Sequence, residues 1–409
     1  MALIVQKYGG TSLGSIEKIL NVAQRVVEVH EQKNEVIVVV SAMAGETDRL
    51  LEMAHRVSSK SNQREMDVLL STGEQRTIAL LAMAIESMGH QARSFLAHQV
   101  RILTDSAFSK ARILKIDPSK LLDVANERKI AVVAGFQGID EDGNLTTLGR
   151  GGSDTTAVAI AAALSAEVCE IYTDVDGVYT TDPAICPKAR KLKRISYDEM
   201  LEMASLGAKV LQIRSVVFAK KYNVPLHVLS SYKKQPGTMV VEEDPSMEKV
   251  LVTGVAYNTD EAKVTLQGFP DRPGIAARLF TAIAEADVIV DMIVGNPTHE
   301  SRSDLTFTVP TLDLDKTLEI VESLKEELGV RNIEADRNIS KVSVVGVGMK
   351  THSGVAARMF STLAREGINI HSVSTSEIKV SCLIDSRYTE LAIRALHDEF
   401  ELENGPAVE

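Results

Sequence analysis

The sequence of 409 residues contains no tryptophan and only three cysteines. Cys169, Cys186 and Cys382 are widely separated, so they match no metal-binding spacing and indicate reduced thiols in a reducing compartment. Positive charge is also scarce, because 45 Lys and Arg stand against 56 Asp and Glu, for a net charge of −11. This balance argues against a nucleic-acid-binding protein, so an anionic ligand must be met by locally placed Lys and Arg.

Targeting signals are missing as well. The N-terminus, MALIVQKYGG, lacks the basic region and the long apolar core of a signal peptide. We see no apolar run near the roughly 20 residues of a membrane span. We therefore expect a cytoplasmic protein with no membrane partner. The chain is too long for one hydrophobic core, so two or three domains are expected.

The stretch Leu148–Asp154, LGRGGSD, places three glycines around an arginine, directly before the alanine-rich run TTAVAIAAAL. The side chains of Ser153, Asp154, Thr155 and Thr156 are available to cap the helix that this run predicts. Glycine N–H groups, a helix start and an arginine together suit a phosphate or a carboxylate. A tight turn without a ligand is an equally common use of such a loop.

Apolar runs alternate with helical stretches over the first part of the chain. Buried strands are expected at Ala2–Gln6, Val36–Val40, Ile130–Ala134, Val168–Thr173 and Pro225–Leu229. Helices are expected from Ser15 to about Val29, from Leu69 to about Met88 and from Gly207 onwards. This order predicts an α/β fold with a mostly parallel sheet and helices on both faces. The polar segment Gln235–Met247 is the expected domain boundary.

Two charged residues in this part allow two interpretations each. Lys7 ends the first expected strand, where it is either an exposed turn lysine or a ligand at the carboxyl edge of the sheet. Glu74 near the start of its expected helix is either a first-turn acid that complements the helix dipole or a ligand for a cationic group.

The second part of the chain repeats itself at an offset of about 80 residues. Ala262–Gly268 is echoed by Ser340–Gly346, and Pro273–Phe280 by Ser353–Phe360. Each copy predicts a strand, a helix, two strands and a helix, which indicates the ferredoxin-like βαββαβ plan. Two copies that share one sheet would form an effector-binding module, and the alternative is a dimer interface without a ligand.

Six motifs, in order, resemble the aspartate kinases of the amino-acid kinase family: KYGGTS, SAMAGET, STGEQ, LGRGGSD, YTDVDGVYTTDP and GAKVLQ. The C-terminal repeats look like paired ACT domains. The resemblance implies a catalytic domain over 1–246, a linker with the first ACT repeat over 247–338 and the second ACT repeat over 339–409. No segment remains for a fused homoserine dehydrogenase, so the resemblance is to the monofunctional form.

The resemblance implies phosphoryl transfer from ATP, accompanied by Mg²⁺, to the side-chain carboxylate of L-aspartate, which gives 4-phospho-L-aspartate. This reaction opens lysine, threonine and methionine biosynthesis. It also implies catalytic roles for Lys7, Asp154 and Lys209, with Asp154 orienting the two lysines. The implied ATP ligands are Lys7, Gly9, Gly10, Thr173, Asp174, Tyr179, Asp182, Lys209 and Val210. The implied aspartate ligands are Ser41, Thr47, Glu74, Arg150, Gly151, Gly152 and Ser153. No dedicated metal-binding cage is visible.

The ACT resemblance implies inhibition by lysine, threonine or both. In the first repeat it points to Asp271, Pro273, Gly274, Ile275 and Ala276, with Asp291 on the strand Ile289–Ile293. In the second repeat it points to His352, Ser353, Gly354, Val355, Asn369, Ile370, Ser374, Thr375 and Glu377. His352 and Ser353 break the DRPG pattern of the first copy, so the two sites are expected to differ.

Partners and rival functions follow from the same resemblance. ACT pairing implies at least a homo-dimer, and an internal start near Met247 would allow an α2β2 assembly. The rivals are a kinase that acts on glutamate or acetylglutamate and a catalytically silent amino-acid sensor. The presence of all five residues argues against the sensor: Lys7, Glu74, Arg150, Asp154 and Lys209.

Overall fold

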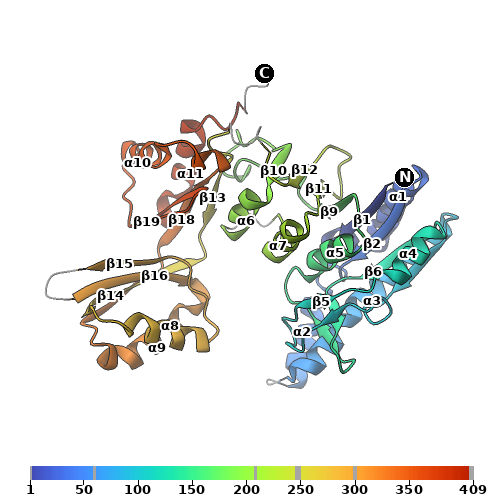
Figure 1. Ribbon diagram of the computed structural model, residues 1–409, viewed down its shortest axis with the longest axis horizontal. Helices are drawn as coiled ribbons and strands as arrows, with labels where there is room; N and C mark the ends of the chain where they lie inside the picture. The colour runs from blue at the N-terminus through green and yellow to red at the C-terminus, as the bar shows by residue number, and fades with distance from the viewer. Residues whose placement is uncertain (1, 59–60, 207–209, 245–249, 298–301, 405–409) are drawn as a thin grey trace. The chain divides into compact units, whose positions relative to one another are not determined.

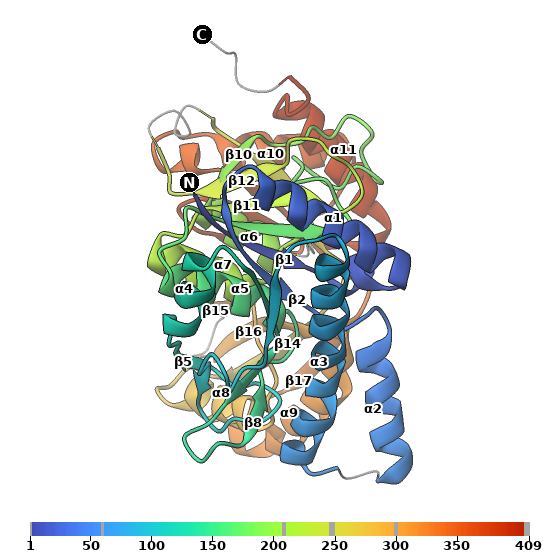
Figure 2. The ribbon, with the colours of Figure 1, turned by 90° about the vertical axis from the view of Figure 1, so that its right-hand side faces the viewer.

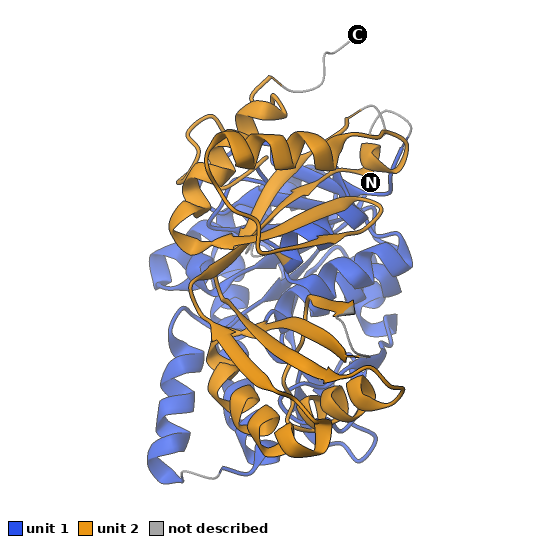
Figure 3. Cartoon of the chain, turned by 90° about the vertical axis from the view of Figure 1, so that its left-hand side faces the viewer, with its two compact units in different colours: residues 1–179, 191–205, 209–247 blue, residues 180–190, 206–208, 248–409 orange. Residues whose placement is uncertain are grey.

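The computed structural model describes residues 2–58, 61–206, 210–244, 250–297 and 302–404. The chain forms two compact units, coloured separately in Figure 3. The first comprises Met1–Tyr179, Lys191–Ser205 and Lys209–Met247, and the second Thr180–Arg190, Leu206–Ala208 and Glu248–Glu409.

The first unit is built on an eight-stranded sheet (Figure 1). Its strands, in spatial order, are β10 (Arg194–Ser196), β12 (Thr238–Val241), β11 (Leu226–Ser230), β9 (Val168–Thr173), β1 (Leu3–Tyr8), β2 (Glu35–Val40), β6 (Ile130–Ala134) and β3 (Ala92–Phe95). Every neighbouring pair is parallel except β11 with β12. The predicted mostly parallel sheet is confirmed. The polar segment Gln235–Met247, expected to be only a boundary, contributes β12.

The helices of the first unit are α1 (Ile16–Glu31), α2 (Glu46–Val57), α3 (Gln63–Ser87), α4 (Ser119–Asn126), α5 (Gly152–Ala163), α6 (Tyr197–Ser205) and α7 (Ile213–Tyr222). Ser15 caps α1 as predicted, because its hydroxyl accepts the N–H of Lys18 at 3.3 Å. The apolar side of α1 and that of α3 bury one face of the sheet (Figure 2). They pack against alternate residues of β2 (Val36, Val38 and Val40), as the two-residue period of a strand requires.

Helix α3 differs from the prediction in two ways. It begins at Gln63 rather than near Leu69, with Asn62 as its N-cap, so Glu74 lies in its interior and the interpretation as a first-turn acid is wrong. By length and composition α3 could also span a membrane, a stretch that the sequence search for apolar runs missed. Its most apolar window is 56% buried inside the protein, as in the core helix of a globular domain.

A small sheet leads into the glycine-rich stretch. Its strands, in spatial order, are β5 (Ile113–Lys115), β4 (Leu103–Thr104), β7 (Gln137–Ile139) and β8 (Leu145–Thr147). A 3₁₀ turn, η1 (Gly10–Leu13), follows β1 on the main sheet.

The first repeat of the second unit has a four-stranded antiparallel sheet. Its elements, along the chain, are β14 (Glu261–Pro270), α8 (Ile275–Glu285), β15 (Ile293–Pro297), β16 (Arg302–Pro310), η2 (Thr311–Asp313), α9 (Leu314–Leu328) and β17 (Asn332–Asp336). This order is the predicted βαββαβ plan. The strand expected at Ile289–Ile293 is displaced, because β15 begins only at Ile293.

The second repeat has a separate sheet in the order β13-β18-β20-β19, so the expected single shared sheet is wrong. Its elements are β13 (Gly254–Asn258), β18 (Ile339–Val345), η3 (Val347–Lys350), α10 (Val355–Arg365), β19 (Ser372–Thr375), β20 (Lys379–Asp385), η4 (Ser386–Tyr388) and α11 (Thr389–Glu399). The edge strand β13 precedes the first repeat in the chain. In the sheet of the second repeat, β13 takes the place of the last strand of the βαββαβ plan, which the C-terminal copy does not supply among the described residues.

Candidate active site

The carboxyl ends of four parallel strands meet at one edge of the main sheet. The register pairs Tyr8 at the end of β1 with Val40 of β2 and with Tyr172 of β9. It also pairs Val40 with Ala134 of β6. The loops that begin here carry several of the predicted ligands, and ligands of open α/β sheets bind outside this edge.

Lys7 and Asp154 form a buried ion pair at this edge. The Nζ of Lys7 lies 2.5 Å from Oδ1 of Asp154, and the two side chains are 11% and 12% exposed. The capping role considered for Ser153, Asp154, Thr155 and Thr156 is wrong. Gly151, at φ 69°, is the N-cap of α5, and no side chain caps the helix. The carboxylate of Asp154 therefore holds a lysine instead of helix N–H groups.

Two glycines allow the backbone loops to pack closely here. A Cβ on Gly10 would lie 2.8 Å from the carbonyl oxygen of Ala42, which follows β2. A Cβ on Gly151 would lie 1.9 Å from Cγ of Gln212, and its φ of 69° is in the left-handed region. Gly9 is the N-cap of η1 and Gly152 opens α5, so both predicted glycines stand at helix starts.

Glu74 reaches the same edge from α3 and retains one open oxygen. Its side chain is buried, and Oε1 accepts the N–H of Ala42 at 2.9 Å. The other oxygen, Oε2, is buried and has no hydrogen-bond partner among the residues that the structure describes. Burial raises the pKa of Glu74 to about 7. A buried carboxyl with an open acceptor is suited to an ammonium group.

The other predicted aspartate ligands lie on the loops after β2 and β8. Arg150 is exposed, and its guanidinium makes no hydrogen bond or ion pair within the described ranges. Ser153 in the first turn of α5 is buried. Ser41 directly follows β2, Thr47 lies in the first turn of α2, and both are half-buried.

Asp67 is a structural residue that the sequence analysis missed. It is fully buried on α3, one heptad before Glu74. Its carboxylate accepts the N–H of Thr147 at 2.7 Å and the N–H of Ser109 at 2.9 Å. Thr147 immediately precedes the LGRGGSD stretch, so Asp67 fixes the entry to it. An acid on the apolar face of a helix was the available signal.

The predicted nucleotide residues line the loop after β9. The hydroxyl of Thr173 donates to Asp174 at 3.1 Å, and that of Tyr179 donates to Asp176 at 2.9 Å. Lys233 lies 3.4 Å from Asp176 and was not predicted, because no motif surrounds it. Lys209 lies outside the described residues, and the helix expected from Gly207 begins, as α7, only at Ile213. Val210 is half-buried just before it.

Asp182 is placed differently from the other nucleotide residues. It belongs to the second unit, within the segment Thr180–Arg190. Its carboxylate accepts the N–H of Ala184 at 2.8 Å and the hydroxyl of Tyr257 at 3.0 Å. In the structure Asp182 is thus a loop-ordering residue held by β13.

The predicted effector residues occupy equivalent loops of the two repeats. Gly274 at φ 99° and Gly354 at φ 98° are the N-caps of α8 and α10. The residues exposed to solvent in these loops are Asp271, Pro273, Gly274, Ala276, His352, Ser353 and Gly354, whereas Ile275 and Val355 are buried. Asn369, Thr375 and Glu377 are exposed and Ile370 and Ser374 half-buried around β19.

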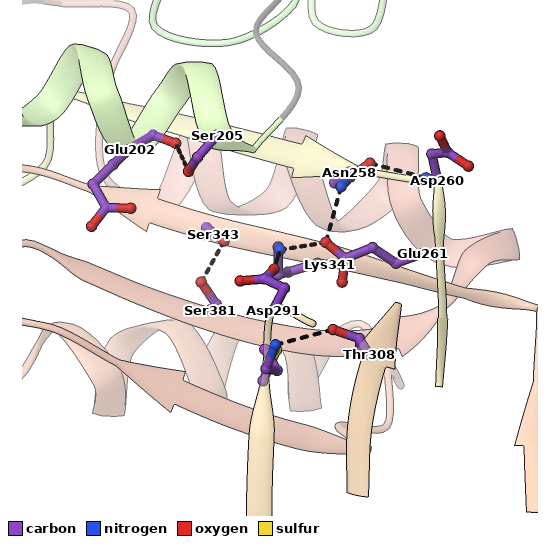
Figure 4. A network of polar contacts seen from close by, with 11 residues as sticks. Glu202, Ser205, Asn258, Asp260, Glu261, Asp291, Thr308, Lys341, Ser343 and Ser381 are labelled. Carbon is purple, nitrogen blue, oxygen red and sulfur yellow. Dashed lines mark hydrogen bonds and ion pairs between the residues drawn. The ribbon is translucent and has the colours of Figure 1, made fainter. Parts of the chain in front are cut away.

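Asp291 has a protein partner already. Its carboxylate accepts from the ammonium group of Lys341 on β18, which also donates to Glu261 on β14 (Figure 4). Lys341 and Glu261 are only 4% and 5% exposed. Asn258 adds a donor to Glu261 at 2.9 Å. This polar cluster of Lys341, Glu261 and Asp291 joins the two repeats.

Among the residues that the structure describes, potential metal ligands are not clustered. Within the described ranges, no group of three or more His, Cys, Asp or Glu side chains could hold a metal ion. The three cysteines are buried and free.

The sequence matches the amino acid kinase family over residues 2–230 and ACT domains over residues 264–328 and 342–400. An aspartokinase of Pseudomonas aeruginosa is 56% identical over 405 residues, which cover 98% of each chain. The structure resembles Escherichia coli aspartokinase III in complex with aspartate and ADP, at 27% identity and a TM-score of 0.79, covering 97% of this chain and 99% of that one.

The same E. coli enzyme in complex with lysine and aspartate gives a TM-score of 0.77 at 26% identity, with the same coverage of both chains. The matches in sequence and in fold agree with one another. The chain belongs to the amino acid kinase family and is one of its aspartate kinases, with two C-terminal ACT domains.

Proposed function

We propose that the enzyme transfers the γ-phosphoryl group of ATP to the side-chain carboxylate of L-aspartate and is inhibited by lysine, threonine or both. A carboxylate oxygen attacks phosphorus, the bond to the β-phosphate oxygen breaks, and ADP leaves with the bonding electrons. The acceptor is already a nucleophile at neutral pH, so the protein has to align two anions and neutralise charge.

The residues at the sheet edge suit these tasks. Lys7, oriented by Asp154, meets the transferred phosphoryl group, with Lys209 as the second expected cation. Backbone N–H groups of Gly9 and Gly10 and the residues Thr173, Asp174, Tyr179 and Val210 bind the rest of ATP. Mg²⁺ would be held mainly by the phosphates and water, and it would neutralise developing charge.

The aspartate assignment is supported by two observations, the open oxygen of Glu74 and the exposed guanidinium of Arg150, for which the described ranges supply no partner. An amino acid presents an ammonium and an α-carboxylate, and Glu74 and Arg150 offer the matching charges. Ser41, Thr47, Ser153 and the backbone of Gly151 and Gly152 complete the proposed pocket. The neighbouring structure that holds aspartate and ADP supports an aspartate substrate and an adenine nucleotide.

Substrate choice tests this assignment against the rival kinases. ADP release should be measured with ATP, Mg²⁺ and, in turn, L-aspartate, L-glutamate and N-acetyl-L-glutamate. We expect turnover on aspartate at a kcat/KM at least about a hundredfold above either rival. Hydroxylamine should trap the product as the side-chain hydroxamate. Preferred turnover on glutamate or its acetyl derivative would overturn the assignment.

Glu74→Gln should weaken aspartate binding in a pH-dependent manner. The carboxyl binds an ammonium only when ionised, and its pKa is about 7 before substrate binds. In the unchanged enzyme the KM for aspartate should therefore rise about tenfold per pH unit as pH falls below 7. In Glu74→Gln it should be high at all pH values. Initial rates between pH 6 and pH 9 measure this.

Stability separates this effect from misfolding. The pKa of Glu74 is raised in the folded state, so folding disfavours the ionised carboxyl. The contribution of Glu74 to stability therefore falls as pH rises from the ordinary pKa of a glutamate toward 7. Glu74→Gln should therefore keep or raise the melting temperature at pH 8. Glu86→Gln, an exposed change on the same helix, should alter neither the KM for aspartate nor the melting temperature. A KM in Glu74→Gln that equals that of the unchanged enzyme would remove Glu74 from the substrate site.

The effector sites are proposed at the starts of α8 and α10. The N–H groups at a helix start bind an amino-acid carboxylate, and Asp271 or Glu377 receives the ammonium. Asp291 is a weaker candidate, since it has to leave Lys341 first. The E. coli enzyme in complex with lysine supports an amino-acid effector. We also propose an oligomer that is at least a dimer through the ACT repeats, in the cytoplasm.

Asp271→Ala should relieve inhibition while the uninhibited rate stays unchanged. Loss of a charged hydrogen bond should raise the inhibitory concentration of the effector about tenfold or more. Dose–response curves for lysine, for threonine and for both together measure the shift. Glu319→Ala, an exposed acid on α9 of the same repeat, serves as the control. Unchanged curves in Asp271→Ala would move the effector site elsewhere.

A further inference from the structure

The loop after β9 leaves the catalytic unit and becomes part of the regulatory one. Tyr179 and Lys191 form an antiparallel bridge. The first unit stops at Tyr179 and resumes at Lys191. The two residues inside this bridge are also paired, because the N–H of Thr180 donates to the carbonyl of Arg190 at 2.9 Å. Together the two pairs form a stem that closes the segment between them. The segment Thr180–Arg190 then belongs entirely to the second unit. Asp182 lies in this segment, three positions after Tyr179.

Backbone and side-chain bonds anchor this segment to the second ACT repeat. The N–H of Val255 on β13 donates to the carbonyl of Thr180 at 2.7 Å. The hydroxyl of Thr180 lies 3.0 Å from Nε2 of His397 on α11. Thr180 and His397 are completely buried, so water does not compete for these bonds.

Further contacts secure the rest of the segment. The hydroxyl of Tyr257 on β13 donates to Asp182 at 3.0 Å. Arg394 on α11 donates to the carbonyl of Ile185 at 2.9 Å, and Ile185 packs against the core of the second repeat. Lys188 pairs with Asp398 at 3.0 Å. Because the anchors come from β13 and α11, a single repeat holds the whole segment.

Burial sets the state of the imidazole at this anchor. It lowers the pKa of His397, so the side chain is neutral at neutral pH. A neutral imidazole offers one donor and one acceptor, and Nε2 makes its hydrogen bond with the hydroxyl of Thr180. Thr180 also accepts the N–H of Arg190 at 3.0 Å, which closes the stem onto the same hydroxyl.

We infer that Tyr257 and His397 are positioning residues for ATP, which order the nucleotide loop by holding Asp182 and Thr180. This inference rests on the proposed nucleotide role of Thr173, Asp174 and Tyr179, which precede Thr180 and Asp182 in the chain. A loop that is ordered only part of the time binds its ligand with an affinity reduced by that fraction. The anchors should therefore change nucleotide affinity without changing aspartate affinity.

The test compares full-length enzymes that lack one or both anchoring hydroxyls. Tyr257→Phe removes only the bond to Asp182, and Thr180→Val removes the hydroxyl that bonds both His397 and the N–H of Arg190. We expect the Kd for ADP and the KM for ATP to rise about threefold in each variant and about tenfold in the double variant. The KM for aspartate should stay unchanged. Calorimetric titration with ADP and initial rates provide the measurements.

Two variants act as controls. Thr180→Ser keeps the hydroxyl and should restore nucleotide affinity to that of the unchanged enzyme. Tyr388→Phe alters a tyrosine that packs against the same core, and its hydroxyl makes no hydrogen bond within the described ranges. It should change neither KM.

The outcomes are distinct. Unchanged ADP affinity in the double variant would overturn the inference. An equal rise in both KM values would also overturn it, because that pattern indicates general loss of structure. Absence of ADP binding by the unchanged enzyme would instead overturn the proposed nucleotide site, and the inference with it.

Discussion

Replacing Lys7 by alanine should lower kcat by about a thousandfold or more, while lysine or threonine still binds. The ammonium of Lys7 stands at the carboxyl end of β1, and Asp154 holds it at 2.5 Å in a site that is nearly closed to water. A fixed cation in such a site stabilises the charge that moves in phosphoryl transfer far better than it could in water. ADP release and calorimetry with lysine and threonine measure the two effects.

Loss of folding has to be separated from loss of catalysis in this experiment. Lys7→Ala leaves Asp154 buried without its cation, which destabilises the fold. Combining Lys7→Ala with Asp154→Asn removes the uncompensated charge, so stability should recover while turnover stays lost. Lys120→Ala, an exposed change on α4, should leave kcat intact. Activity that survives in Lys7→Ala would show that the phosphate assignment is wrong.

Lys341→Met should cost the regulatory unit about 3–5 kcal/mol of unfolding free energy. The change removes the cation from Glu261, which is 5% exposed, and frees Asp291, which is half exposed. Burial raises the pKa of Glu261 even with Lys341 present, and without it the pKa should rise further. Ionising that carboxyl then costs more as pH increases. The loss in urea-unfolding midpoint should therefore be larger at pH 8 than at pH 6.

A second change distinguishes an unpaired charge from poor packing. Adding Glu261→Leu to Lys341→Met removes the buried acid, so most of the lost stability should return. Lys325→Met breaks an exposed pair with Glu322 at 3.0 Å, and it should shift stability by no more than about 0.5 kcal/mol. Equal losses in the double variant and in Lys341→Met would mean that the loss comes from poor packing and not from an unpaired charge on Glu261.

Sequence patterns predicted the catalytic sheet because its strands are locally obvious. β2 and β6 are nearly continuous runs of buried valine, isoleucine and alanine, and Ser15 is a plain cap for α1. The same patterns put Lys7 and the glycine-rich stretch at strand and helix ends. The ion pair between Lys7 and Asp154 spans 147 positions (154 − 7). The resemblance to aspartate kinases suggested it, and spacing alone could not.

Other features of the fold depend on contacts between residues far apart in the chain, and sequence patterns could not predict them. The early start of α3 escaped the search for apolar periodicity because its first turn is polar and unburied. Its first buried residue, Asp67, is explained only by its bonds to the strand before LGRGGSD. β13 completes the sheet of the second repeat although the first repeat follows it in the chain. The end of the motif YTDVDGVYTTDP, Thr180–Pro183, was predicted to be catalytic, but in the structure it belongs to the regulatory unit, where Tyr257 binds Asp182.

The rate of ADP release with ATP, Mg²⁺ and L-aspartate, measured with lysine, with threonine and with both, tests the account most directly. We predict robust turnover on aspartate that falls when one effector or the pair is added. A rate that stays the same with lysine, with threonine and with both would contradict the regulatory role of the ACT repeats. No turnover on aspartate, with amino-acid binding retained, would contradict the account as a whole and leave a sensor.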